Sequence, residues 1–337
     1  MTVVVTGAAG FIGGHLVRAL AGRGYRVAGI DRRPGVPAAT AIALAADLSE
    51  PHDDADALLG EAEAVFHLAA RSGVRDADVQ AEAHRRRDNI EATRRVLYAV
   101  PLGVPLVVTS SSSVYGGTRG RPCVETDPLR PIGGYAHSKV DVERLCAKRV
   151  SHGGLLAVAR PFTVAGEGQR PDMAVARWLS DARARRPLRI LGSPSRTRDL
   201  TDVRGVVEGL IRMAERGVRS TINLGTGRAH SLGAIAAAVC DAVGVDPGRM
   251  VRPAGPHEVS ATLADTRRCA QLLGFVPTTD LAALLCRQAA ATTADREATT
   301  ATVGDLAATA ADRGATTADP TSTGPARPHR ALVRGQS

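Results

Sequence analysis

Tyr135 and Lys139 are the pair of residues in this chain best suited to catalysis by proton transfer. Their spacing places the phenol and the ammonium on one face of a helix if residues 135–150 are helical. A free tyrosine has a pKa of about 10, and a nearby positive charge lowers it. Tyr135 would then act as a general base toward an alcohol, with the hydroxyl of Ser111 bridging it to the substrate oxygen. Such a pair also occurs on ordinary surface helices, so its interpretation depends on the segments around it.

A glycine-rich loop follows the first hydrophobic segment of the chain. Residues 2–6 are rich in β-branched side chains and predict a buried strand, and residues 11–22 predict a helix. Between them, Gly7 permits a turn with positive φ, Gly10 allows close approach to a pyrophosphate, and Gly13 allows the helix to pack closely on the strand. The free amides at the helix N-terminus can bind phosphate. A glycine triplet is weak evidence in a chain with 35 glycines, but this strand and helix around it predict a dinucleotide-binding loop.

The second predicted strand ends at an acidic residue. Residues 25–30 form this strand, and the carboxylate of Asp31 would lie where the ribose hydroxyls of an adenine dinucleotide bind. Because its charge repels a 2′-phosphate, Asp31 favours NAD over NADP. Arg32 and Arg33 weaken this preference, since an arginine there could pair with such a phosphate. Asp47 could bind the adenine amino group, although a helix N-cap or a solvated loop acid explains it equally well.

Two further hydrophobic segments are expected to end at the same edge of a parallel sheet. Residues 64–70 predict a strand that runs into a loop of small residues, and His67 within it is interpreted as a core histidine rather than a catalytic base. Residues 105–109 predict another strand, which leads directly into the serine run at 110–113. Ligands of open parallel sheets bind at the carboxyl ends of the strands, so the serines are predicted to form a polar surface next to the nicotinamide.

Together these segments resemble the extended short-chain dehydrogenase/reductases, specifically their NAD-dependent sugar-nucleotide epimerase/dehydratase branch. The resemblance covers roughly residues 1–288. It rests on TGAAGFIG at 6–13, Asp31, DL at 47–48, HLAA at 67–70, Asn89, SSSSVYG at 110–116, YAHSK at 135–139, RPFTVAGEGQRPDMA at 160–174, TRDLTDV at 197–203 and NLGTG at 223–227.

The resemblance implies a role for each matching residue. The implied catalytic residues are Ser111, Tyr135 and Lys139. The implied NAD-binding residues are Gly7, Gly10, Phe11, Ile12, Gly13, Asp31, Arg32, Asp47, Leu48, Leu68, Ala69, Ala70, Asn89, Tyr135 and Lys139. The implied substrate-binding residues are Ser111, Ser112, Ser113, Thr163, Arg170, Arg198 and Arg252. Two of these, Arg198 and Arg252, are expected at the substrate diphosphate, and no metal site is expected.

The two residues after Ser111 distinguish the reactions of this family. Dehydratases resemble this pattern but carry an Asp-Glu pair there, and decarboxylases typically place Glu second. Ser112 and Ser113 are poor acids, so epimerisation at C4 of the sugar of a UDP-sugar is expected instead. These hydroxyls and Thr163 could bind a sugar carboxylate, and residues 170–174 resemble the UDP-glucuronate 4-epimerases. A neutral hexose would also bind these hydroxyls, so a UDP-glucose 4-epimerase is the alternative.

Two other functions stay open from the sequence. A net nucleotide-sugar dehydrogenase or 4-ketoreductase would use the same residues but exchange its cofactor. A dinucleotide-sensing scaffold would be expected to have lost Tyr135 or Lys139, and both are present.

The chain departs from the family pattern at 165–167, where Ala-Gly-Glu replaces Tyr-Gly-Pro, and at 204–206, where Arg-Gly-Val replaces an Asp-Asp pair followed by Val. The first change puts the sugar preference in doubt.

The predicted fold is α/β, with a Rossmann-type doubly wound parallel sheet and a smaller, interleaved C-terminal substrate lobe. Residues 1–160 and 195–225 are expected to form the NAD-binding domain, and residues 161–194 and 226–288 the substrate-binding lobe. Residues 289–337 are rich in Ala and Thr without apolar periodicity, which predicts a disordered tail.

Composition narrows the expected partners and location. The net charge is +9, but no basic patch is interleaved with aromatic residues, so no nucleic-acid partner is expected. Five cysteines without metal-type spacing, no signal peptide and no apolar run long enough to cross a membrane favour the cytoplasm. Apolar stripes at 81–99 and 135–150 resemble family helices that pair across a dimer, so a homodimer is expected, although the stripes could merely cover the sheet.

Overall fold

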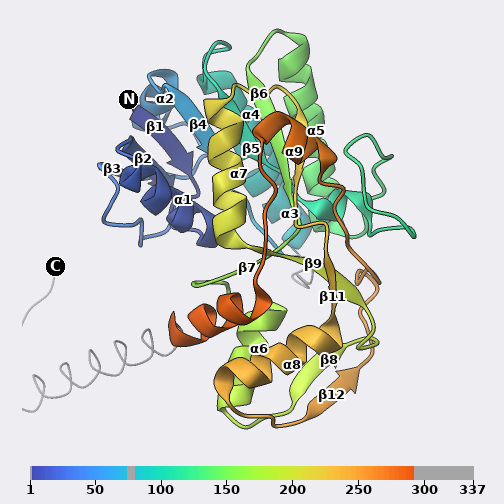
Figure 1. The fold of residues 1–337 in the computed structure, drawn as a ribbon. Coiled ribbons are helices and arrows are strands. Elements are labelled where there is room, and N and C mark those ends of the chain that lie inside the picture. The colour runs from blue at the N-terminus through green and yellow to red at the C-terminus, as the bar shows by residue number, and fades with distance from the viewer. Residues whose placement is uncertain (1, 74–79, 292–337) are drawn as a thin grey trace, which may run out of the picture. The chain divides into compact units, whose positions relative to one another are not determined.

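The computed structural model describes residues 2–73 and 80–291, which are built around a parallel sheet of seven strands. The strand order is β10-β6-β5-β4-β1-β2-β3 (Figure 1). The strands are β1 Thr2–Thr6, β2 Arg26–Asp31, β3 Ile42–Ala45, β4 Ala64–His67, β5 Leu106–Thr109, β6 Leu156–Pro161 and β10 Thr221–Leu224. The chain moves outward from β1 to β3 and then returns to β4 on the other side of β1. Ligands of open parallel sheets bind at the carboxyl ends of the strands beside such a reversal.

Helices cover both faces of this sheet (Figure 1). On one face, α1 Phe11–Gly22, α7 Val203–Glu215 and α9 Arg267–Leu273 pack in one hydrophobic core with the strands. The other face is covered by α2 Asp53–Gly60, α4 Ala92–Ala99 and α5 Gly134–Ser151. Because both faces are buried, the strands are almost continuously apolar, as in VVV at 3–5 and LVV at 106–108.

A smaller group of elements surrounds a separate hydrophobic core. Two sheets belong to it, one of β7 Thr163–Ala165, β9 Thr197–Asp202 and β11 Ala229–Ser231, the other of β8 Leu188–Leu191 and β12 Arg249–Arg252. Its helices are α6 Ala174–Arg183, α8 Leu232–Val243 and the helical residues 281–291. Trp178, Leu188, Val239 and Leu284 are among its buried side chains.

The predicted Rossmann-type fold is confirmed. The first strand and the first helix have the predicted bounds, and the second strand, β2, begins and ends one residue later than predicted. The single helix predicted at 81–99 is instead three pieces: α3 Ala81–Arg85, the π-helix η1 Arg86–Glu91, and α4. Helix 281–291 includes residues 289–291, where the sequence predicts the tail to begin; the rest of that tail, 292–337, lies outside the described residues. Among the described helices, none has the length and apolarity needed to span a membrane.

Candidate active site

The loop after β1 makes the tight turn that its glycines predict. Gly7 has a φ of 72°. A Cβ on Gly13 would lie 2.1 Å from the carbonyl oxygen of Gly7, and one on Gly10 would lie 2.9 Å from the same atom. Helix α1 begins directly after this turn, and within the described residues no side chain caps its N-terminus. The first-turn amides at Phe11 and Ile12 therefore have no intrahelical acceptor and can bind a phosphate.

The loop after β4 packs against this glycine turn. A Cβ on Gly7 would lie 2.7 Å from the amide nitrogen of Ala69, so only glycine fits there. The Ala69 amide donates to the hydroxyl of Thr6 at 3.2 Å, which fixes the loop after β4 to the end of β1. Leu68, Ala69 and Ala70 consequently line the carboxyl end of the sheet beside the predicted phosphate site.

Asp31 lies at the end of β2, directly beside the glycine turn. It is buried, and its two carboxylate oxygens accept hydrogen bonds from the amides of Ala9 at 3.0 Å and Arg33 at 2.9 Å. Arg32 points instead to Asp88, which it binds through both terminal nitrogens at 3.0 and 2.9 Å. Because the Arg32 guanidinium is already paired, the geometry favours NAD over a dinucleotide with a 2′-phosphate.

Asp47 and Leu48 follow β3 at the same edge of the sheet. Leu48 is buried, and Asp47 Oδ1 accepts from both the amide and the hydroxyl of Ser49, at 3.0 and 2.7 Å. Partial burial raises the pKa of Asp47, but the bonds from Ser49 and the charges of Arg87 and Arg32 outweigh it, so the net pKa is lowered. Asp47 thus closes a local turn, in agreement with the alternative that it is an acidic residue of a loop. Its contact with adenine stays a prediction.

His67 is a core histidine, as the sequence predicts. Its Nδ1 lies 2.8 Å from the hydroxyl of Thr6 and its Nε2 lies 2.9 Å from the hydroxyl of Thr93. Burial, with a smaller contribution from the charge of Lys139, lowers the pKa of His67 to about 3. The ring is therefore neutral at physiological pH and joins three segments of the core rather than handling protons.

This burial predicts a pH dependence of stability. Native His67 stays neutral down to about pH 3, whereas unfolded His67 takes up a proton near its ordinary pKa of about 6.5. The unfolded state binds more protons between these values, so acidification destabilises the fold, by up to about 1.4 kcal/mol per pH unit. We expect urea denaturation of His67→Gln to show a shallower loss of unfolding free energy between pH 6.5 and pH 4.5 than wild type. His152→Gln, at an exposed histidine, should follow the wild-type slope; equal slopes for all three proteins would contradict the assignment.

Asn89 lies in the π-helix η1 and joins two segments of the site. Its Oδ1 accepts the amide of Arg71 at 2.7 Å, and its Nδ2 donates to the Arg71 carbonyl at 3.1 Å and to the hydroxyl of Ser138 at 2.9 Å. Ser138 is on α5, next to Lys139. Asn89 is fully buried, so it fixes the loop after β4 to the helix that carries the predicted base. Direct contact of Asn89 with NAD stays a prediction.

Tyr135 and Lys139 occupy the first two turns of α5, and both contact the end of β5. Lys139 Nζ donates to the carbonyl of Thr109 at 2.8 Å, and the Tyr135 hydroxyl bonds with Ser111. Burial lowers the pKa of Lys139 to about 8. Burial also raises the pKa of Tyr135, whereas the bond with Ser111 and the charge of Arg170 lower it. Arg170 is thus a further cation that favours the Tyr135 phenolate, and the effect of Lys139 on this pKa stays a prediction.

The serine run continues as the short 3-10 helix η2, Ser112–Tyr115. Ser111 starts this turn, with its hydroxyl accepting the amide of Ser113 at 3.1 Å. The hydroxyl oxygen of Ser113 is buried and has no hydrogen-bond partner within the described part of the chain. Thr163 starts β7, shortly after the end of β6, the neighbour of β5 in the sheet. An unpartnered buried hydroxyl at this edge is suited to an oxygen-rich ligand.

Arg170 reaches across the carboxyl edge of the sheet. Its guanidinium binds both oxygens of Asp172, at 3.0 and 2.8 Å, and donates to the carbonyl of Ser72 at 3.1 Å. Ser72 belongs to the loop after β4, so Arg170 joins the segment after β7 to the segment beside the glycine turn. Its charge also acts on Tyr135.

The two arginines expected at the diphosphate differ in their surroundings. Arg198, on β9, is mostly buried and donates to the carbonyl of Thr197 at 2.8 Å and to the carboxylate of Glu258 at 3.4 Å. Arg252 ends β12 and is exposed, at the edge of the two-stranded sheet. Arg198 is held in place within the fold, whereas Arg252 is a surface residue whose contact with substrate stays a prediction.

Sequence reasoning missed the residues that hold these side chains. Asp88 pairs with Arg32 from 56 residues away, and Glu258 pairs with Arg198 from 60 residues away. Residue spacing and hydrophobic periodicity predict contacts only between residues of the same helix or strand. No local pattern in the sequence therefore identifies Asp88 or Glu258 as a partner. The π-helix is likewise invisible in the apolar stripe at 81–99.

The glycine turn, the uncapped helix and the buried Asp31 carboxylate together fit NAD, because they provide amides for a pyrophosphate and an acceptor for ribose hydroxyls. A family model described as "NAD dependent epimerase/dehydratase family" matches residues 3–225. The chain belongs to this family. It is therefore an enzyme of the NAD-dependent epimerase/dehydratase family, with NAD as its cofactor.

Similar proteins cover nearly the whole described chain. The UDP-glucose 4-epimerase of Mycolicibacterium smegmatis is 32% identical over 84% of this chain and 95% of its own. MoeE5, solved with UDP-glucuronic acid and NAD, is 36% identical over 88% of this chain and 100% of its own, with a TM-score of 0.80. The UDP-glucuronic acid 4-epimerase of Bacillus cereus, solved with UDP-glucuronic acid and NAD, is 29% identical over 86% and 98% of the two chains, with a TM-score of 0.80. These relatives of the NAD-dependent epimerase/dehydratase family differ in their sugars.

Proposed function

We propose that this enzyme is a UDP-glucuronate 4-epimerase. The observation that carries the proposal is the serine turn after β5, where Ser111 acts on the Tyr135 hydroxyl and Ser112 and Ser113 stand in place of acidic residues. Without a carboxyl group at these two positions, the site has no acid there to drive elimination or decarboxylation. Relatives that act on or bind UDP-glucuronic acid support the choice of sugar.

In this proposal the residues of the site move one proton twice. Tyr135 removes the proton of the sugar 4-hydroxyl, and Ser111 holds the same oxygen. Lys139, bound to the Thr109 carbonyl, would supply positive charge one helical turn from Tyr135. NAD held by the glycine turn and Asp31 would supply the hydride acceptor and donor that oxidation and re-reduction at C4 require. Tyr135 then gives the proton back, so no external oxidant is consumed.

The remaining predicted residues bind the substrate in the proposed complex. The unpartnered hydroxyl of Ser113, with those of Ser112 and Thr163, would donate to the sugar carboxylate. Arg198 and Arg252 would contact the diphosphate. We assign NAD to residues 1–160 and 195–225, and the sugar nucleotide to the lobe at 161–194 and 226–288.

Purified enzyme mixed with UDP-glucuronate, without added NAD, tests the proposal. Formation of UDP-galacturonate, followed by chromatography, is the expected result. Turnover that requires stoichiometric NAD would instead indicate a dehydrogenase or 4-ketoreductase. UDP-glucose is assayed in parallel, because MoeE5 has also been solved with UDP-glucose and NAD. Conversion of UDP-glucose alone would assign the enzyme to the neutral hexose, and binding of NAD without any turnover would favour a sensing scaffold.

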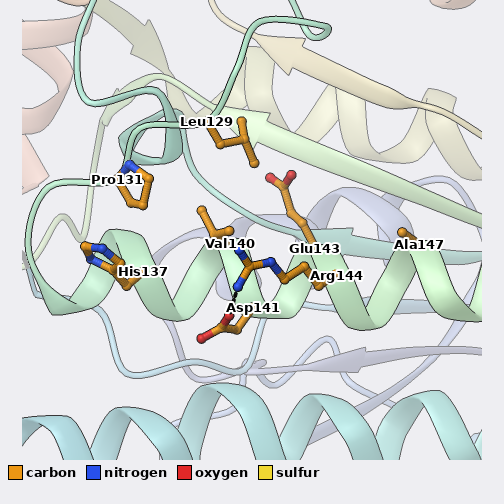
Figure 2. Close-up of a pocket in the computed structure, with 8 residues that line it drawn as sticks. All are labelled: Leu129, Pro131, His137, Val140, Asp141, Glu143, Arg144 and Ala147. Atoms are coloured by element: carbon orange, nitrogen blue, oxygen red, sulfur yellow. Dashed lines mark hydrogen bonds and ion pairs between the residues drawn. The ribbon is translucent and has the colours of Figure 1, made fainter.

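We further propose that two copies pair through α4 and α5. These helices pack against each other, and they carry the exposed side chains of Tyr98, 92% accessible, and Val150, 40% accessible. A hollow of about 350 Å³ lies beside α5, lined by Leu129, Pro131, His137, Val140, Asp141, Glu143, Arg144 and Ala147 (Figure 2). A partner helix would bury this apolar surface.

Tyr98→Glu is expected to shift the protein toward monomer, because a charge buried in such an interface would lack a partner. Sedimentation velocity over a range of concentrations measures the change. Val251→Glu is the matched control, since Val251 is also an exposed apolar residue, on β12. If Tyr98→Glu stays dimeric while Val251→Glu dissociates, the interface lies elsewhere; a monomeric wild type would reject the dimer.

A further inference from the structure

Helix α5 holds the end of β5 at two consecutive residues. Lys139 Nζ donates to the carbonyl of Thr109 at 2.8 Å, and the hydroxyl of Ser110 donates to Glu143 Oε1 at 2.6 Å. Lys139 and Glu143 are one turn apart on the same face of α5. The two residues just before Ser111 are therefore fixed to the helix that carries the proposed base.

The far end of the serine segment is held by the same carboxylate through an arginine. Arg160, on β6, donates to Glu143 through Nε at 2.9 Å and Nη2 at 2.6 Å. Its Nη1 donates to the hydroxyl of Tyr115 at 2.7 Å, and the guanidinium lies 4.9 Å from the centre of the Tyr115 ring. Tyr115 is the last residue of η2. Residues 111–114 are thus held between two ends that both connect to the Glu143–Arg160 pair.

Both charges of this pair are taken out of water. The Glu143 side chain is 10% exposed and that of Arg160 is 5% exposed. In Figure 2, Glu143 leaves α5 on the side of Leu129, while Arg144 and Asp141 pair with each other nearby. A buried ion pair contributes little net stability, because desolvation offsets the attraction. The Glu143–Arg160 pair does more than fill the core, because it also bonds Ser110 and Tyr115 at the two ends of the serine segment.

We propose that Glu143 is a positioning residue, which, together with Arg160, sets the place of Ser111 relative to Tyr135. This inference rests on the proposed function, in which Ser111 and Tyr135 share the substrate oxygen. Glu143 touches neither reacting group and acts through Ser110 and Arg160. A displacement of about 1 Å between groups that share a proton can cost about 100-fold in rate.

Glu143→Gln in the full-length protein is the central variant. It keeps the shape of the side chain but removes the charge and one acceptor for Arg160. We expect kcat to fall about 100-fold with KM for the UDP-sugar within about twofold of wild type. Asp181→Asn is the matched control, because Asp181 is also a buried carboxylate paired with an arginine, Arg186, but lies on α6. A loss of kcat in Glu143→Gln no larger than in Asp181→Asn would overturn the proposal.

A double-mutant cycle separates positioning from general destabilisation. If Glu143 acts through Ser110, Ser110→Ala added to Glu143→Gln should lower kcat no further than Glu143→Gln alone. Fully additive losses would contradict this route. Glu143→Asp, which keeps the charge on a shorter side chain, is expected to recover part of kcat.

Crystal structures of wild type and Glu143→Gln give a result that does not depend on turnover. The distance between the Ser111 and Tyr135 hydroxyl oxygens should change in the variant, and an unchanged distance would overturn the inference. A wild type that converts no UDP-sugar would reject the proposed function, while this comparison would still decide whether Glu143 positions Ser111.

Discussion

Replacing Tyr135 with phenylalanine is expected to lower kcat about 1,000-fold while leaving the affinity for the UDP-sugar nearly unchanged. The substitution removes only the hydroxyl that bonds with Ser111, and the ring keeps its packing on α5. Because burial raises the pKa of Tyr135, the wild-type rate should increase with pH as the phenol loses its proton. The residual rate of the variant should lack this increase. Steady-state rates between pH 6 and pH 10 measure both effects.

The control for this substitution is the same chemical change at Tyr25. That residue precedes β2, at the opposite end of the strands from Tyr135, and its hydroxyl donates to Glu215 at 3.3 Å near the surface. Tyr25→Phe should keep wild-type kcat and the wild-type pH profile. A Tyr135→Phe enzyme with kcat within tenfold of wild type would assign the proton transfer to another group.

Those parts of the site that depend on local geometry could be predicted from sequence. Gly7 and Gly13 satisfy constraints set by their own turn, and Tyr135 and Lys139 share a helix face because they are four residues apart. The strands β1 and β5 are short apolar runs whose burial on both faces follows from composition. Each of these features is encoded within about one turn or one strand.

Features that depend on tertiary contacts could not be predicted in the same way. The effect of Arg170 on the pKa of Tyr135 depends on where the segment after β7 returns to the sheet, and Arg170 is 35 residues from Tyr135 in sequence. In the sequence, Glu143 is one of several charged residues of a helix and Arg160 lies near the end of a strand. Nothing in either segment predicts that the two side chains meet. Their pairing, like that of Arg32 with Asp88, follows from topology rather than from spacing.

The glycine turn provides the second large effect, at Gly13. A Cβ on this residue would lie 2.1 Å from the Gly7 carbonyl oxygen, a backbone atom that can move only if the whole turn shifts. Gly13→Ala is therefore expected to destabilise the fold by about 1–3 kcal/mol, as overpacking does elsewhere. A displaced turn should also weaken NAD binding by about 10- to 100-fold, since each factor of ten corresponds to about 1.4 kcal/mol. Urea denaturation and titration with NAD measure the two effects separately.

Gly22→Ala provides the matched control on the same helix. Gly22 is the last residue of α1, and a Cβ there would meet no atom within 4 Å. Alanine lowers the conformational entropy of the unfolded chain, so this variant should be more stable than wild type by about 0.4–1 kcal/mol and should bind NAD normally. The two substitutions add the same methyl group to one helix and are expected to have opposite signs. Equal stability of the two variants would mean that the turn shifts without a cost in free energy, and that the close contact of α1 with Gly7 is not what requires glycine at position 13.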